Sequence, residues 1–186
     1  MPRFARARRA VVAVLLSGTL LATTAACGGD DKPSGTANGQ ATPSVSATAE
    51  RQKLAKTRFV ANAGLAAGAT YQWIVKPYRA GTFKKGADGR TVALVKAGLA
   101  GAFAYNRLKA AVNNAKGDPL LSKAVAPLTA GIDSLKDMGT KLRKGEATGG
   151  DVGAFEKVIT SVKDAGRSAG AEVVDKVPST SQLSGG

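Results

Sequence analysis

Apolar residues recur with helical spacing in the second half of the chain. After Asp118 and Pro119, which together are typical of a helix start, they alternate at intervals of four and three residues. The resulting stripe consists of Leu121, Val125, Leu128, Ile132, Leu135, Gly139 and Leu142. Gly145 is typical of the residue that follows a helix end. The pattern predicts a helix over 118–144, with a kink at Pro127 because proline has no amide hydrogen.

A second apolar stripe begins at residue 152 and predicts a helix over 151–177. Its members are Val152, Phe155, Ile159, Val162, Gly166, Ala169, Val173 and Val177. Glycine and alanine in mid-stripe indicate close approach of a neighbouring helix, since glycine costs about 1 kcal/mol in a helix interior. We therefore expect this stripe to face the core.

Two earlier segments, 49–76 and 89–114, are compatible with helix and apolar over most of their circumference. The first should end before Pro77, because a residue that precedes proline avoids the helical conformation. Gly64 and Gly68 lie within it, away from any strand-to-helix turn, which favours close helix packing over a phosphate cradle or a membrane-dimer motif.

Four helical segments with short connections predict an all-α fold, an antiparallel four-helix bundle over residues 49–178. The connection near 77–88 is the longest, and function is sought there. Residues 27–48 consist almost entirely of small and polar residues, which cannot offset their ordering entropy by burial. We expect 27–48 to be a disordered linker and 179–186 a disordered tail.

Residues 1–26 have the pattern of an export signal. Arginines precede an apolar run over residues 10–21, and small residues follow it. The run is shorter than the roughly 20 residues that a membrane-spanning helix needs. We therefore expect cleavage rather than a permanent span.

The segment Thr24-Ala25-Ala26-Cys27 resembles the lipobox of bacterial lipoproteins. Ala25, Ala26 and Cys27 match the family pattern, whereas Thr24 stands where the family usually carries Leu, Val or Ile. The resemblance implies that Cys27 is diacylglycerylated, becomes the first mature residue and anchors the protein on the extracytoplasmic face of the cell membrane. The composition around the signal is similar to that of lipoproteins from high-GC Gram-positive bacteria. The Sec and twin-arginine export routes both stay open.

Composition excludes several kinds of chemistry. The 186 residues include no histidine and one cysteine. The chain therefore has no histidine general base, no Ser-His or Cys-His pair, no histidine or multi-cysteine metal site and no internal disulfide. Asp137, Asp164 and Glu172 each precede a lysine or arginine by three or four residues, which indicates ion pairs on helix faces. We expect no enzyme, no catalytic residue, no metal and no cofactor.

Charge is unevenly distributed along a chain of net charge +14. Residues 50–116 contain 13 Lys plus Arg and two acids, whereas 117–178 contain nine of each. The basic residues of the first hairpin include Lys76, Arg79, Lys84 and Lys85, and the aromatic residues Trp73, Tyr78 and Phe83 are interleaved with them. Such a mixture suits an anionic membrane surface or a polyanion such as a cell-wall polymer, and we do not expect nucleic acid.

The sequence thus predicts a membrane-anchored extracytoplasmic lipoprotein that binds or scaffolds anionic envelope surfaces. Lys76, Arg79, Lys84 and Lys85 are the expected contacts, with Trp73 as one of the interfacial aromatics. A competing interpretation places Tyr71 and Trp73 in the core and makes the lysines solubilising charges. An alternative function is a helical carrier or sensor for a small apolar ligand. The small side chains of the many alanine and glycine residues leave room for a cavity if the helices stay apart, and no room if the helices pack closely.

The first testable prediction concerns Cys27. The mature protein from its native host should begin at this residue and carry lipid, and a Cys27→Ser protein should leave the membrane fraction. Mass spectrometry of the purified protein and cell fractionation measure the two outcomes. An unmodified cysteine that is still joined to residues 1–26 contradicts the prediction.

Overall fold

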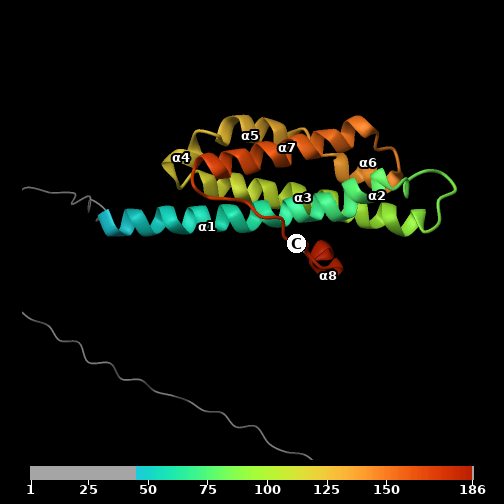
Figure 1. The fold of residues 1–186 in the computed structure, drawn as a ribbon, viewed down its shortest axis with the longest axis horizontal. Helices are drawn as coiled ribbons and strands as arrows, with labels where there is room; N and C mark the ends of the chain where they lie inside the picture. Colours follow the sequence, from blue (N-terminus) through green and yellow to red (C-terminus); the bar gives the residue numbers. More distant parts are fainter. Residues whose placement is uncertain (1–44, 186) are drawn as a thin grey trace, which may run out of the picture. The chain divides into compact units, whose positions relative to one another are not determined.

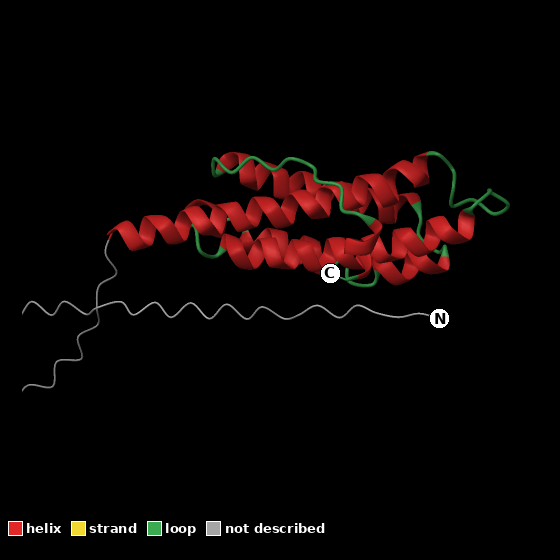
Figure 2. Ribbon diagram, turned by 90° about the horizontal axis from the view of Figure 1, so that it is seen from below, coloured by secondary structure: helices red, strands yellow, loops and turns green. Residues whose placement is uncertain are grey.

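The computed structural model describes residues 45–185 (Figure 1). Residues 1–26, Cys27 and most of the expected linker lie outside the described residues. Within 45–185 every regular element is a helix, and the helices pack around one apolar core (Figure 2). This confirms the all-α class. None of the described helices is both long and apolar enough to cross a membrane.

The elements, in chain order, are α1 (Val45–Thr70), the π-helix η1 (Tyr71–Val75), α2 (Lys76–Arg79), α3 (Arg90–Ala115), α4 (Pro119–Ser122), α5 (Val125–Asp133), α6 (Met138–Lys144), α7 (Gly149–Ser168) and α8 (Thr180–Ser184). The helices α1, η1 and α2 form one continuous rod, with α3 beside it (Figure 1). The rod starts at Val45, inside the segment that we expected to be linker.

The first helical segment does not end before Pro77, contrary to expectation. The amide of Lys76 donates to the carbonyl of Tyr71, five residues back, so the helix widens into a π-turn immediately before the proline. Pro77 then falls in the first turn of α2, where its missing amide hydrogen costs least. The helix therefore continues to Arg79.

The third predicted helix is broken into α4, α5 and α6, although its apolar stripe still faces the core. Asp118 caps α4 by accepting from the amides of Leu120 and Leu121, as predicted. The first break lies at residues 123–124, because the ring of Pro127 crowds the carbonyl four residues before it. The result is an interruption rather than a kink. The second break, at 134–137, has no signal that we identified in the sequence.

The fourth predicted helix ends at Ser168 and not near residue 177. Gly170 has a φ of 64°, and the amide of Ala171 donates to the carbonyl of Gly166. This is a Schellman motif, in which a left-handed glycine terminates the helix. Residues 171–179 then continue without regular structure, and we call this segment the strap.

The strap lies across α1 at Gly64 and Gly68. The amide of Lys176 donates to the carbonyl of Gly64 at 2.9 Å, and the carbonyl of Lys176 occupies the space that a Cβ on Gly68 would need. The two glycines thus allow close packing, as expected, but the partner is an extended segment and not a helix. A side chain at either position would push the strap away.

The expectation of a disordered tail over 179–186 is wrong for residues 180–184, which form α8. Ser179 and Gln182 form a capping box at its start. Leu183 is buried, and α8 packs against α3. The short polar sequence is ordered because one leucine reaches the core and the cap satisfies the first amides.

The strap contact generates a stability prediction. Gly68→Ala should lower the free energy of unfolding by about 2 kcal/mol or more, because the new methyl group overlaps the backbone of Lys176. Gly153→Ala is the matched control. It lies in α7 with no atom near the new Cβ, and it should raise stability by about 0.5–1 kcal/mol. Urea unfolding measures both; equal effects of the two substitutions contradict the role of the strap.

Candidate binding site

The connection between α2 and α3, residues 80–89, lies at the end of the molecule opposite the start of α1 (Figure 1). Gly81, Gly86 and Gly89 adopt positive φ angles and make its turns. The Arg90 side chain donates from Nε to the carbonyl of Phe83 at 3.0 Å, which ties the loop back to α3. The loop therefore presents its side chains from a hydrogen-bonded frame.

Tyr78 and Phe83 meet in this frame. Their rings are 6.3 Å apart in an edge-to-face arrangement, and both side chains are half-buried against the core. Trp73 is also half-buried against the core, with the Lys96 ammonium 5.3 Å from the centre of its ring. The three predicted aromatics are thus partly core residues, and Trp73 is separate from the Tyr78–Phe83 pair.

The four predicted cations divide into two kinds. Arg79 donates to the carboxylate of Glu156 on α7 at 2.6 Å, which fastens α2 to α7. Lys76, Lys84 and Lys85 are exposed, and no carboxylate among residues 45–185 lies within ion-pair distance of them. Lys76, Lys84 and Lys85 therefore remain unpaired among the described residues, whereas Arg79 has a carboxylate partner in Glu156.

Two grooves flank the loop. The first, of about 420 Å³, is lined by residues that include Tyr78, Phe83, Lys84, Leu94 and Ala147, and we call it the Tyr78 groove. The second, of about 610 Å³, lies between α2 and the start of α3 and is lined by residues that include Trp73, Lys76, Pro77, Val92 and Lys96. We call it the Trp73 groove.

Sequence reasoning missed Val92 and Lys96 as site residues. They belong to the second predicted helix, and only its antiparallel packing against η1 and α2 brings them to Trp73. The sequence predicts that the two helical segments form a hairpin, which was the signal that residues of the second segment lie near Trp73. It does not predict the π-turn, which changes which residues of η1 and α2 face α3. The indole nitrogen of Trp73 is buried and has no hydrogen-bond partner, so packing and Lys96 hold this ring.

The grooves offer apolar surface and ammonium groups. Among residues 45–185 no cluster of three or more carboxylate or thiol side chains is arranged to hold a metal ion. The arrangement is therefore suited to holding molecules that combine apolar and anionic parts.

Asp151 fixes the wall of the Tyr78 groove. Its carboxylate accepts from the amide and hydroxyl of Thr148, both at 2.8 Å, and it pairs with Lys141 at 3.2 Å. These hydrogen bonds, foremost the one from the Thr148 amide, hold the pKa of Asp151 below its ordinary value of 3.8. The capping box starts α7 and so fixes the connection that carries Ala147.

The lowered pKa gives a pH prediction. The ionised Asp151 carboxylate contributes to the free energy of unfolding. This contribution is fully present above pH 3.8, the pKa of the group in the unfolded chain, and it is lost as the pH falls through the lower pKa of the folded state. Asp151→Asn should therefore cost about 1 kcal/mol at pH 7, and the difference from wild type should shrink below pH 3.8. Urea unfolding across this range measures it. Asp164→Asn, in an exposed pair with Arg167, should cost under about 0.5 kcal/mol at pH 7. The prediction is contradicted if the difference in the free energy of unfolding between wild type and Asp151→Asn stays constant with pH.

Comparison with known proteins adds no assignment to this geometry. No protein-family model, curated protein or solved structure matches the chain. The function is therefore argued from the residues of the loop and the two grooves.

Proposed function

We propose that the chain is a non-enzymatic extracytoplasmic lipoprotein, anchored in the cell membrane through a lipidated Cys27, whose far end binds anionic material of the cell envelope. The binding surface is the loop end, which we define as Lys76, Lys84 and Lys85 with the Tyr78–Phe83 pair. We further interpret the four packed helical rods as an antiparallel four-helix bundle with an interrupted third member.

The observation that carries the proposal is the set of three exposed lysines at one end of the molecule with no carboxylate partner among the described residues. Lysines that only solubilise a surface are usually interspersed with acids, as they are in the second half of this chain. Along residues 71–95 the one acid is Asp88, against five lysines and arginines, and Glu156 of α7 is paired with Arg79. An anion that approaches the loop end therefore meets net positive charge.

The length of the first rod sets how far the loop end can lie from the membrane anchor. Residues 45–79 rise about 50 Å along the helix axis, so the loop end is far from the point where the chain leads towards Cys27. The 18 residue steps from Cys27 to Val45 span at most about 60 Å. A tether of this length lets the loop end reach lipid head groups as well as an anionic wall polymer outside the membrane, so both are compared as ligands.

Binding to a polyglycerol phosphate polymer tests the proposal. The soluble chain of residues 28–186 should bind it at low ionic strength and lose affinity as salt rises, because exposed charges are screened beyond about 10 Å at 0.1 M salt. Lys76→Gln, Lys84→Gln and Lys85→Gln combined should weaken binding about tenfold at low salt. Isothermal titration calorimetry measures both effects.

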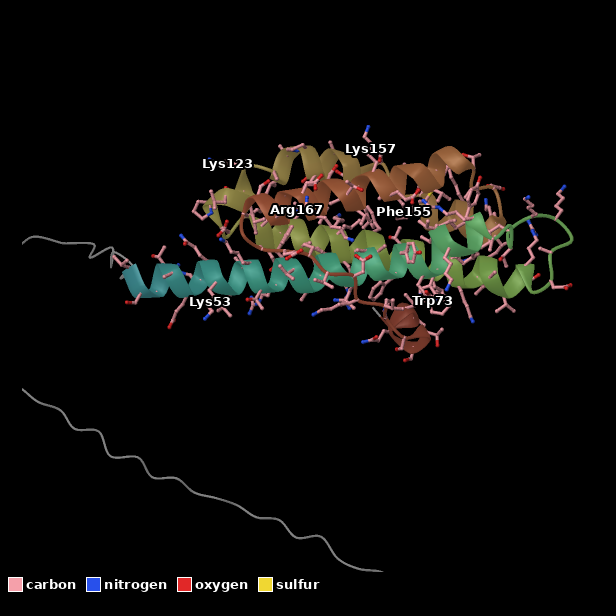
Figure 3. The ribbon with its side chains drawn as sticks, in the orientation of Figure 1. Lys53, Trp73, Lys123, Phe155, Lys157 and Arg167 are labelled. Carbon is pink, nitrogen blue, oxygen red and sulfur yellow. The ribbon has the colours of Figure 1, made fainter. Side chains whose placement is uncertain are left out.

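A second triple variant separates position from total charge. Lys123→Gln, Lys136→Gln and Lys157→Gln combined remove the same charge from exposed sites on the α4–α5 connection, the α5–α6 connection and α7. Figure 3 shows Lys123 and Lys157 on the other side of the molecule from Trp73. This control should change affinity less than about threefold. Equal losses from both triples, or tighter binding to neutral than to anionic vesicles and polymers, refute the loop end as the binding surface.

A further inference from the structure

The two walls of the Trp73 groove have the same residue spacing. Gln72, Trp73, Lys76, Pro77 and Ala80 line it from η1, α2 and the residue after them, and Asp88, Gly89, Val92, Ala93 and Lys96 line it from the start of α3. Intervals of one, four, five and eight residues place each set on one face of its helix. The groove is thus a strip between two helix faces that run in opposite directions.

The two ends of this strip differ in charge. Lys96 lies over the ring of Trp73, 5.3 Å from the ring centre, and Lys76 lies one turn further along the same wall as Trp73. Lys96 therefore marks the Trp73 end, and Lys76 lies between this end and the middle of the strip. Asp88, the one carboxylate that lines the groove, lies at the opposite end of the strip together with Ala80. A negative group is attracted to the Trp73 end and repelled from the other.

The middle of the strip is apolar and open. Pro77 and Ala93 line it, and Val92 is 59% exposed, which leaves much of its side chain in water. The wall from Trp73 to Ala80 rises about 10 Å, enough to lie along a medium-length hydrocarbon chain. Covering this surface with an apolar ligand removes it from water, which is favourable in proportion to the area covered.

We propose that the Trp73 groove binds an amphiphile whose anionic head lies between Lys76 and Lys96 and whose aliphatic chain covers Trp73, Pro77 and Val92. A carboxylate and a phosphate head share the required chemistry, since each accepts hydrogen bonds from two ammonium groups. A cationic head would meet two like charges at the Trp73 end. A second copy of this basic chain would meet the same repulsion.

This inference shares Lys76 with the loop-end surface and does not otherwise rest on the function proposed for it. Val92 and Lys96 are outside the loop-end surface, and Lys84 and Lys85 do not line the Trp73 groove. Each proposal can therefore be refuted without the other. Substitutions at residues 84 and 85 test polymer binding, and substitutions at residues 92 and 96 test amphiphile binding.

The test uses the tryptophan itself as a probe. The sequence has one tryptophan, so the fluorescence of the soluble chain of residues 28–186 reports on this groove alone. Decanoate and decyl phosphate, titrated below their critical micelle concentrations, should each give a saturable change in emission, and calorimetry should give the same Kd. Decyl maltoside, with a neutral head, should bind at least about threefold more weakly.

Two substitutions with matched controls locate the site. Lys96→Gln should raise the Kd for decanoate about two- to fivefold, whereas Lys123→Gln should leave it within about 1.5-fold. Val92→Asp should raise it about tenfold by placing a charge under the chain, whereas Val174→Asp, at a valine that is 64% exposed on the strap, should not. Calorimetry serves for Lys96→Gln, because removal of the ammonium also alters the emission of Trp73.

Three results overturn the proposal. The first is the absence of saturable binding of either anionic amphiphile, and the second is equal affinity for decyl maltoside. The third is a Kd that Lys96→Gln and Val92→Asp change no more than their controls do. If binding is seen and located, the tighter of the two anionic probes identifies a carboxylate or a phosphate head as the natural chemistry.

Discussion

The close approach of backbones through small residues is the constraint on which the rest of this fold depends. Ala63, Ala66, Ala97 and Ala100 are buried between the long helices α1 and α3. Gly98 and Gly101 on α3 similarly admit α6 at Gly139, where added methyl groups would meet backbone or Cβ atoms at about 3 Å or less. Each helical glycine costs about 1 kcal/mol in propensity, and at Gly98, Gly101 and Gly139 the close packing of α3 and α6 offsets that loss. The positions of α6 and of the Tyr78 groove follow from this spacing.

The elements that local signals determine were predictable from the sequence. The apolar stripe after Asp118, its cap and the left-handed Gly145 all lie where the sequence predicts. The errors come from signals that conflict. Residues 173 and 177 continue the helical spacing past Gly170, yet the glycine ends the helix. Pro77 is a strong stop signal, yet a π-turn absorbs it.

The sequence predicted those features of the candidate site that depend on one continuous segment, and not those that depend on contacts between distant segments. Lys84 and Lys85 are exposed as residues of a basic loop should be. The pairing of Arg79 with Glu156 was not predictable, because it joins positions 77 residues apart whose neighbourhood depends on how α7 packs. The Trp73 groove depends in the same way on the register between two helices, which the π-turn alters.

The strap also has a consequence for the order in which this chain folds. The hydrogen bond between Lys176 and Gly64 joins the last part of the described chain to the first helix. Closing so large a loop costs entropy that only the assembled helices can offset, so the contact forms late. Until the C-terminal residues are available, α1 keeps the carbonyl of Gly64 and the surface of Gly68 open to water. We therefore expect residues 171–179 to close over α1 after the helices have packed, and a chain cut before residue 171 to leave the face of Gly64 and Gly68 uncovered.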